Sequence, residues 1–532
     1  MPQRFASLLE IAAAPDISEA YTSEEDTPLS FSGYQYLNYV RDIPILVGRA
    51  RQKSNGSSTG SSSSISSMAS MSFYPHITYS CSTALEREAP PLRELVCRMV
   101  SDGFPQALIG AFQDIQSSDA EAGALEQWFS ELDVHEALRD NVRINGLPDA
   151  DDDLVLQCSL RSWTRALTLM AEALSATQRH LRDNDDPDHG LGLVRFAEAS
   201  MFKMLAFADA LVAAEQVSCR SITDKLWSLL CLHIHISKAS ETLMPSLLEV
   251  SRSLPPFTER KLLVNNILTK MEKDFSATED KMGKAMWTLM QDAKSFFFAS
   301  EDSSGNILPP QDEEIHETTE LTLEYVTMLW ANDTVLNSII WRFSDSWHHT
   351  TTTNMIADMI RDLEHHLEEE SKSLQNNSQR YMFLLNNFDF IEEKLNEIHI
   401  APRHMFGKDQ NVKSYMRRYL DVSWEPVLSC LQSDDGGTTT SCLFPSKQCF
   451  SLEKFQSMLK ATCKAQMFWK VPNPNLRQRL RKAIIGKVIG PYNDYVEAYP
   501  ELKKHYDDLP INCSSSSSER LNDMLNQLFE GV

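Results

Sequence analysis

Apolar residues recur along most of the chain at the three- and four-residue spacing of α-helices. The clearest pattern lies between residues 381 and 398, where the apolar positions are separated by 3, 4, 3, 4 and 3 residues (Tyr381, Leu384, Phe388, Ile391, Leu395 and Ile398). That spacing places all six side chains on one face of a helix. We expect this face to be buried in a bundle, and Pro402 to stop the helix.

Similar periodic patterns begin near Pro91 and are separated by breaks that contain Pro, Gly or Asp. They predict helices at residues 159–182, 192–216, 221–252, 259–299 and 316–345. Glycine is scarce, with 18 residues in 532, and no fixed repeat period recurs, which argues against a short-repeat solenoid. The predicted fold class is all-α, an elongated rod of stacked antiparallel helical bundles.

The breaks divide the chain into five predicted segments. The first, residues 1–90, is poorly patterned and contains a Ser-rich linker at 54–72, where eleven residues are serine. Such a composition buries too little apolar area to fold. The remaining segments are N-terminal and middle helical bundles at 91–300, an acidic loop at 301–315, a helical bundle at 316–445 and a C-terminal bundle with a basic stretch at 446–532.

Composition favours a globular protein of the cytoplasm. Hydrophobic residues make up 42% of the chain and charged residues 23%. No apolar run approaches the roughly 20 residues that cross a bilayer, and the N-terminal residues do not form a secretory signal. The ten cysteines show neither CxxC pairs nor framework spacing, so we expect reduced thiols.

The charge distribution is uneven. The formal net charge is -24, yet the stretch from Lys454 to Asn493 holds nine Lys/Arg and no Asp or Glu. The stretch from Ser295 to Trp341 shows the opposite, nine acidic residues and no basic ones. The basic stretch predicts a locally positive surface that suits anionic partners such as membrane headgroups. Nucleic acid fits less well, because no aromatic platform is interleaved with the basic residues and the net charge is repulsive.

A helical wheel locates the membrane-binding candidates within this stretch. Leu476, Leu480, Ile484 and Val488 share one face, and basic residues surround it. Because the charges do not form one stripe, a dedicated membrane-insertion helix is disfavoured. The candidates for contact with an anionic surface are Arg477, Arg479, Arg481, Lys482 and Lys487. A solvated helix surface or internal charge pairing remains an equal alternative.

The sequence contains none of the common catalytic or cofactor-binding motifs, such as a phosphate-binding glycine loop, a nucleophile elbow or HExxH. Three histidine pairs occur, at 233 and 235, 348 and 349, and 365 and 366. No carboxylate or cysteine shares the spacing that a metal site needs, so we expect exposed helical histidines. We therefore expect no cofactor, no metal and no enzymatic activity.

Several segments have the residue order of a known protein family. Trp469–Arg477, followed by Pro491-Tyr492 and Leu528–Gly531, is similar to its C-terminal signature. Tyr381–Asn387 and Tyr419–Trp424 are similar to two of its internal segments, and Met201–Leu205 gives a weaker match. The family that these segments resemble is the seventy-kilodalton subunit of the exocyst complex, in its plant version, and the resemblance covers about residues 92 to 532.

The resemblance implies a rod of stacked helical bundles that tethers secretory vesicles at the plasma membrane during exocytosis. It implies other exocyst subunits and phosphoinositides as partners, and a cytoplasmic protein that is peripheral at the membrane. Two features depart from the family. No N-terminal coiled coil is recognised in residues 1–90, and Asn512 and Ser515 replace two membrane-contacting lysines. These departures favour an alternative function, a diverged paralogue that acts as a protein-interaction scaffold outside the exocyst, for example in plant defence.

Overall fold

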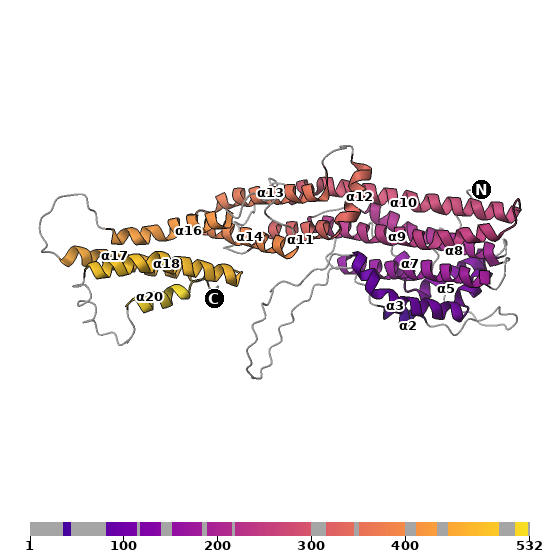
Figure 1. Ribbon diagram of the computed structural model, residues 1–532, viewed down its shortest axis with the longest axis horizontal. Coiled ribbons are helices and arrows are strands. Elements are labelled where there is room, and N and C mark those ends of the chain that lie inside the picture. The colour runs from indigo at the N-terminus through magenta and orange to yellow at the C-terminus, as the bar shows by residue number, and fades with distance from the viewer. Residues whose placement is uncertain are drawn as a thin grey trace, which may run out of the picture. The chain divides into compact units, whose positions relative to one another are not determined.

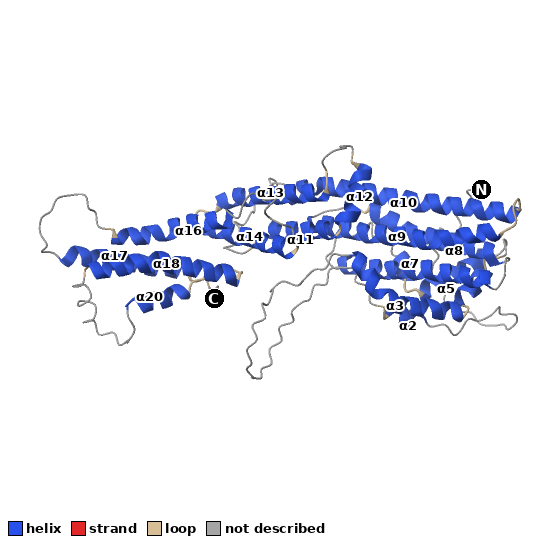
Figure 2. Ribbon diagram, in the orientation of Figure 1, coloured by secondary structure: helices blue, strands red, loops and turns tan. Residues whose placement is uncertain are grey.

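The structure is a computed structural model, and every regular element that it describes is a helix (Figure 1, Figure 2). The residues described are 36–43, 81–113, 118–139, 152–183, 189–214, 219–298, 315–344, 350–399, 411–432, 445–499 and 517–529. The predicted all-α fold built of helical bundles is confirmed. The Ser-rich segment at 54–72 and most of the acidic segment at 301–315 lie outside the described residues.

The chain divides into two compact units. Unit 1 comprises Met1–Ala293 and Ala331–Thr350, and unit 2 comprises Lys294–Trp330 and Thr351–Val532. The chain passes between the units at three places, which lie inside a long helix, at the break between two shorter helices and just before another helix.

Unit 1 is built around three long helices whose apolar faces meet. Its elements are α2 (Tyr36–Arg41), α3 (Cys81–Ser101), α4 (Phe104–Gly110), α5 (Ser118–Glu131), α6 (His135–Arg139), α7 (Asp152–Asp183), α8 (His189–Ala213), α9 (Cys219–Ser253), most of α10 (Glu259–Phe297) and α12 (Asp333–Phe343). Trp163 of α7 is fully buried, stacks on Phe207 of α8 and donates its indole N–H to the carbonyl of Met204 at 3.0 Å. Because its indole N–H is hydrogen-bonded, Trp163 buries a large apolar surface without leaving a polar atom unpaired.

Unit 2 contains the basic stretch and most of the segments that carry the family resemblance. Its elements are α11 (Glu317–Ala331), α13 (Thr352–Glu370), η2 (Ser371–Ser373), α14 (Asn377–Glu397), α16 (Asn411–Leu428), η3 (Ser429–Leu431), α17 (Pro445–Gln466), α18 (Pro474–Ala498) and α20 (Ser517–Asn526). Helix α14 packs against α13 and α16, and α18 packs against α16 and α20. Helix α16 also packs against α17, so it contacts α14, α17 and α18.

Three of the five predicted helices agree with the structure to within three residues at both ends (192–216, 221–252 and 259–299). The helix predicted at 159–182 begins earlier, at Asp152, and the prediction of one helix over 316–345 is wrong. The chain breaks at Asn332, whose φ of -119° and ψ of 23° are not helical, so α11 ends at Ala331 and α12 begins at Asp333. Asn and Asp are weak helix formers and favour helix starts, because their side chains compete for backbone hydrogen bonds. An apolar spacing that continues across such a pair does not require a continuous helix.

Helix α14 is buried more completely than its apolar stripe predicted. Every residue from Met382 to Ile391 is buried, including Asn386, Asn387 and Asp389. The helix ends at Glu397, followed by Ile398, whereas Pro402 lies outside the described residues. The apolar stripe alone predicts that Asn386, Asn387 and Asp389 face solvent. In the structure, neighbouring helices and loops cover these three side chains.

The expectation of exposed histidines is wrong for His235. Its side chain is buried, and Nδ1 lies 2.7 Å from the carbonyl oxygen of Cys231 one turn earlier. Burial, and then the charge of Arg342, lowers the pKa of the neighbouring His233. His348 and His349 lie outside the described residues. Among the residues that are described, no cluster of three or more His, Cys, Asp or Glu could hold a metal ion.

None of the helices in the described ranges combines the length and the apolar character needed to cross a membrane.

Candidate functional site

Helix α18 carries the membrane-binding candidates, and its start is defined by local chemistry. The Asn473 side chain accepts a hydrogen bond from the amide of Asn475 at 2.9 Å, and Pro474 occupies the first turn. Both are favoured at helix N-termini. The wheel prediction is confirmed on the apolar side, because the four residues that it placed on one face are all buried (Leu476, Leu480, Ile484 and Val488).

Arg479 pairs with a buried carboxylate of α14. Its guanidinium lies 2.5 Å from Oδ1 of Asp389, whose other oxygen accepts from Nδ2 of Asn473 at 2.7 Å. Burial raises the pKa of Asp389, although the Arg479 charge and the Asn473 hydrogen bond oppose that shift. The Arg479 side chain is still 53% exposed, so this cation pairs internally and faces solvent at the same time.

Arg477 and Arg481 bind backbone carbonyl groups of two loops. The Arg477 guanidinium donates from Nε at 3.2 Å and from Nη2 at 3.0 Å to the carbonyl of Val471. Arg481 donates from Nε to the carbonyl of Leu528 at 2.8 Å, after the end of α20. The rigid fork of donors suits this use. These two cations therefore hold the loop before α18 and the turn after α20 against α18.

The last two candidates differ in their surroundings. Lys487 lies 2.8 Å from Asp421 and 3.2 Å from Glu425 on α16. Burial lowers its pKa, but the hydrogen bonds to these two carboxylates outweigh burial, and the pKa is raised overall. Lys482, by contrast, is exposed on the outer side of α18. Four of the five candidates therefore bind groups within unit 2, whereas Lys482 is exposed on α18.

Two adjacent asparagines of α14 tie separate parts of unit 2 together. Asn387 accepts from the amide of His316 at 2.9 Å and from the hydroxyl of Thr319 at 2.8 Å, where α11 begins. Asn386 donates to the carbonyl of Lys470 at 3.0 Å. Because buried amides are costly unless bonded, these contacts specify how α11 and the loop before α18 lie on α14.

Aromatic side chains complete the same junction. The Tyr419 hydroxyl donates to Gln466 at 2.6 Å and accepts from the indole of Trp424 at 3.4 Å. The Tyr419 ring lies 6.5 Å from that of Trp469 and 6.4 Å from that of Phe529. Most of the segments that carry the family resemblance in unit 2 therefore meet in one place, whereas Tyr492 stacks on Phe455 of α17. Their shared role in the structure is to join α14, α16 and α18 with the C-terminal loop.

The outward face of α17 is a basic and apolar surface that the sequence reasoning missed. Its buried face repeats at three and four residues, at Leu452, Phe455, Leu459, Cys463 and Gln466. The opposite side exposes Phe450 (66%) and Met458 (37%) between Lys454, Lys460 and Lys464, and Phe468 (63%) follows the helix. A wheel drawn over 445–468 would have found it. We call the six exposed residues (Phe450, Lys454, Met458, Lys460, Lys464 and Phe468) the α17 face.

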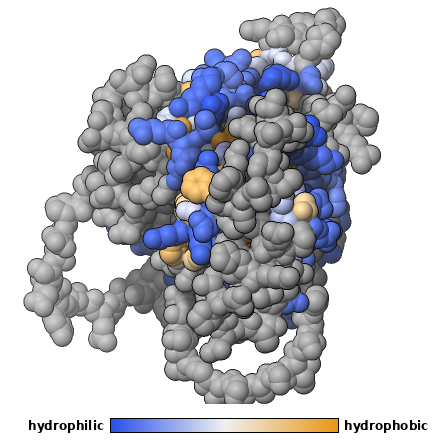
Figure 3. Space-filling view, turned by 90° about the vertical axis from the view of Figure 1, so that its left-hand side faces the viewer, coloured by the Kyte–Doolittle hydropathy of each residue, from blue (hydrophilic) through white to orange (hydrophobic). Residues whose placement is uncertain are grey.

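This face differs from the ordinary surface of the protein. Figure 3 presents the side of the molecule at the left of Figure 1, where α17 is labelled, and shows a few apolar side chains among hydrophilic ones. Single exposed apolar residues are normal in globular proteins. The α17 face combines two exposed Phe with three Lys, and the exposed Glu453 lies beside Lys454, just before the acid-free stretch from Lys454 to Asn493 begins. Its chemistry suits an anionic partner with an apolar layer.

The two residues that stand in place of the family lysines, Asn512 and Ser515, lie outside the described residues.

Comparisons with known proteins give a consistent result. The family model for the C-terminal part of the Exo70 subunit of the exocyst complex matches residues 161–527. The chain is 22% identical over 461 residues to exocyst complex component EXO70A3 of Arabidopsis thaliana, covering 83% of this chain and 71% of the relative. It is 21% identical to EXO70A1 of the same organism (84% and 67% covered) and 21% identical to EXO70B2 (77% and 63% covered).

A solved structure of Exo70 from S. cerevisiae is also similar, at 14% identity with a TM-score of 0.37, covering 84% of this chain and 98% of the yeast chain.

Proposed function

Because the chain belongs to the Exo70 family of exocyst subunits, whose C-terminal model matches residues 161–527, we propose that it works as a tethering subunit in exocytosis. Exo70 subunits are structural components of the exocyst, which tethers vesicles for exocytosis. The observation that carries the proposal is the extent of the family match, which includes nearly all of unit 2 and the long helices α8 to α10 of unit 1. The relatives in Arabidopsis are all named as exocyst components.

The proposal places the chain in the cytoplasm, bound to other exocyst subunits and peripheral at the plasma membrane. Its role is mechanical rather than catalytic, since a tether has to hold two membranes through protein contacts. Partner subunits and an anionic membrane surface are the ligands that this role requires.

We assign the membrane contact to the α17 face together with the exposed cations of α18. Each Lys near an anionic surface contributes about 1 kcal/mol, so three lysines on α17 and Lys482 on α18 give a few kcal/mol. Phe450 and Phe468 add apolar contact with the headgroup boundary. Arg479 is exposed and can contribute, whereas Arg477, Arg481 and Lys487 have contacts inside the bundle that already explain them.

Membership of the complex is tested by affinity purification of the full chain from plant cells, with mass spectrometry of the proteins recovered. Recovery of several exocyst subunits is the expected result. Recovery of another protein without any exocyst subunit would favour the scaffold alternative and would contradict the tether.

The membrane contact is tested separately by vesicle flotation with phosphatidylcholine vesicles that either contain or lack phosphatidylinositol bisphosphate. Reversing three charges (Lys454→Glu, Lys460→Glu and Lys464→Glu) is expected to abolish binding. A control with the same change in net charge reverses three lysines of unit 1 (Lys203→Glu, Lys273→Glu and Lys284→Glu) and is expected to keep most of it. Equal losses in both variants would show a net-charge effect and contradict the assignment.

A further inference from the structure

The first described segment of the chain, residues 36–43, is a short helix that lies on α3 and α5 of unit 1. Its apolar residues Tyr36, Val40 and Ile43 are four and three positions apart, share one face and are all buried. A helix of six residues is not stable in water by itself. Helix α2 therefore depends for its helical conformation on the surface that receives it.

Tyr36 is the first anchor of α2 on that surface. Its ring lies 5.1 Å from the ring of Phe104, and Phe104 lies 5.7 Å from Trp128. The Tyr36 hydroxyl donates to Oδ2 of Asp102 at 2.8 Å. The surface thus contacts both the ring and the hydroxyl of Tyr36. The Tyr36 ring is the first of three neighbouring aromatic rings, followed by Phe104 and Trp128, which are buried in unit 1.

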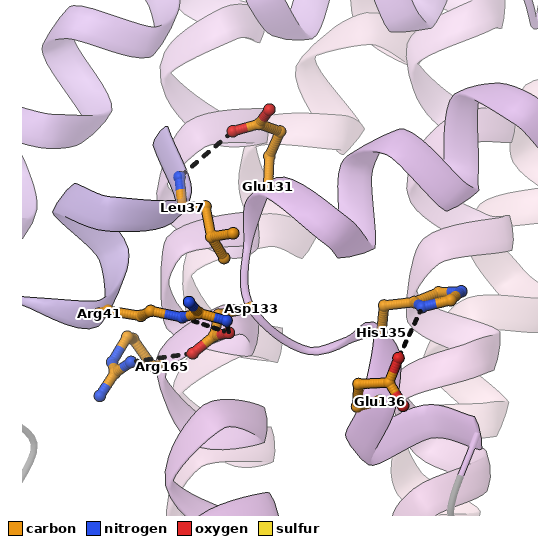
Figure 4. A network of polar contacts seen from close by, with 7 residues as sticks. All are labelled: Leu37, Arg41, Glu131, Asp133, His135, Glu136 and Arg165. Atoms are coloured by element: carbon orange, nitrogen blue, oxygen red, sulfur yellow. Dashed lines mark hydrogen bonds and ion pairs between the residues drawn. The ribbon is translucent and has the colours of Figure 1, made fainter. Parts of the chain in front are cut away.

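Two carboxylates next to this aromatic site bind the backbone and the basic end of α2. Oε2 of Glu131 accepts from the amides of Tyr36 at 2.7 Å and Leu37 at 3.2 Å, which are among the first amides of the helix and have no partner within it. Arg41 donates from Nε to Oδ1 of Asp133 at 2.9 Å (Figure 4). The surface therefore recognises a helix N-terminus and a cation five residues further on.

Asp133 is held in place independently of α2. Its φ of 57° lies in the left-handed region, which is uncommon for a residue other than glycine. Its second carboxylate oxygen lies 3.7 Å from the guanidinium of Arg165, whose side chain is 11% exposed (Figure 4). A contact from the core of unit 1 thus fixes one oxygen and leaves the other oriented toward Arg41.

Helix α2 is far along the chain from the residues that hold it. Between Ile43 and Cys81, where α3 begins, lie 37 residues, and the hydrogen bonds from Tyr36 to Asp102 and Glu131 join positions 66 and 95 residues apart. These are tertiary contacts, which a helix of another protein with the same groups could also make.

We propose that this surface, the α2 seat (Asp102, Phe104, Trp128, Glu131 and Asp133), is a docking site for a short helix of a partner protein. Helix α2 occupies the seat in the free chain and is exchanged for the partner's helix. Charge complementarity defines that partner, since three carboxylates face the occupant. Its helix carries Tyr or a similar aromatic residue first, an aliphatic residue four positions later and Arg or Lys at the next position, the pattern of Tyr36, Val40 and Arg41.

The experiment uses the full chain and a labelled peptide with the sequence of residues 33–44 as the stand-in for a partner helix. Val40→Asp places a charge on the fully buried side of α2 and is expected to release it. Asn38→Asp makes the same kind of change on the exposed side and serves as the matched control. We expect the Val40→Asp chain to bind the peptide at least about tenfold more tightly than wild type or Asn38→Asp, because its seat is vacant.

Two further measurements connect the binding to the seat. Hydrogen exchange of residues 36–43 verifies release, and Tyr36→Ala replaces Val40→Asp if the latter stays docked. Adding Glu131→Lys and Asp133→Lys to the released chain is expected to remove peptide binding while the helical circular dichroism signal is kept. A released chain that binds no peptide up to about millimolar concentration would overturn the proposal, because the vacant seat would then have no measurable affinity for the helix that it holds in wild type.

Light scattering distinguishes a partner helix from a second copy of this chain. We expect the wild-type chain to be a monomer at micromolar concentration, since its own α2 occupies the seat. A wild-type dimer that the Val40→Asp variant fails to form would assign the seat to the α2 of a second copy and would overturn the partner assignment.

Discussion

At the scale of single residues, the buried polar groups of unit 2 determine which segments lie together. Asn387 is fully buried and bonds to the start of α11, while its own amide donates to the carbonyl of Phe383 at 2.9 Å. A side chain that satisfies three groups in a buried place has few substitutes, because any other residue leaves some of them unpaired.

Replacing this side chain tests that interpretation. Asn387→Ala leaves the amide of His316 and the hydroxyl of Thr319 without their acceptor, so we expect the free energy of unfolding to fall by about 2–3 kcal/mol. The control is Asn396→Ala, on an exposed position of the same helix, which is expected to change stability by less than about 0.5 kcal/mol. Urea denaturation measures both, and similar losses would contradict the role of Asn387.

A second residue-scale feature is Glu364 on α13. Burial, and then the charge of Glu368, raises its pKa to about 7, while Arg361 opposes the shift. The native state therefore holds this proton over a pH range in which the unfolded chain has already released it. Stability from this group is present below the unfolded pKa of about 4.3 and is lost as the pH rises toward about 7.

The corresponding prediction compares Glu364→Gln with wild type at about pH 5 and about pH 8. Gln mimics the protonated carboxyl, so we expect the variant to gain about 1–2 kcal/mol relative to wild type at the higher pH, after allowing for solvent screening. At the lower pH the difference should be clearly smaller, because only part of the stability from this group is lost between its unfolded pKa and about pH 5. Glu272→Gln, at an exposed position of α10, is the control, and a gain independent of pH would rule out the titration of Glu364 as its cause.

At the scale of elements, close approach rather than periodicity explains how α10 and α12 pack in unit 1. A Cβ atom added to Gly283 of α10 would lie 2.5 Å from Cε2 of Phe343 at the end of α12. No pair of heavy atoms tolerates that distance without a shift. Glycine at this position is thus required by the neighbouring ring, although glycine weakens the helix by about 1 kcal/mol relative to alanine.

Gly283→Ala is accordingly expected to destabilise unit 1 by about 1–3 kcal/mol, because the overpacking outweighs the gain in helix propensity. Gly486→Ala on α18 is the matched substitution, since a Cβ there meets nothing within 4 Å. We expect it to stabilise the protein by up to about 1 kcal/mol. Thermal denaturation of the two variants should move in opposite directions, and a shared direction would refute the packing explanation.

The sequence predicted the long helices but missed one helix break and one short helix, and each outcome has a physical reason. Long helices such as α9 and α10 were located from their apolar period, which depends only on residues three and four apart. The break at Asn332 was missed because the period continued across it. Helix α2 was not predicted, since six residues are too few to display a period and its fold depends on distant carboxylates.

At the scale of the whole molecule, the division into two compact units predicts where substitutions act. Asn387→Ala should increase hydrogen exchange mainly within unit 2, and Gly283→Ala mainly within unit 1, because each loses contacts inside its own unit. Exchange measured by mass spectrometry on both variants checks this. If either variant raised exchange evenly across both units, the chain would unfold as one cooperative body instead.

The charge distribution is also a property of the whole chain, and the structure changes which basic residues are expected to bind an anionic partner. The acid-free stretch from Lys454 to Asn493 was evident from the sequence, and it was assigned to the basic residues of α18. The structure pairs Arg479 with Asp389, ninety residues away, and Lys487 with Asp421. The cations that remain most exposed are instead Lys482 and the lysines of the α17 face.

The sequence by itself determined that this protein is helical, where most of its long helices lie and which family it resembles. These properties follow from spacing and residue order, which are local and can be read along the chain. The tertiary structure decided which charges are free, that Asn386 and Asn387 bind two separate segments, and where α2 docks. Such contacts join residues dozens of positions apart, so only the packing of the helices brings them within bonding distance.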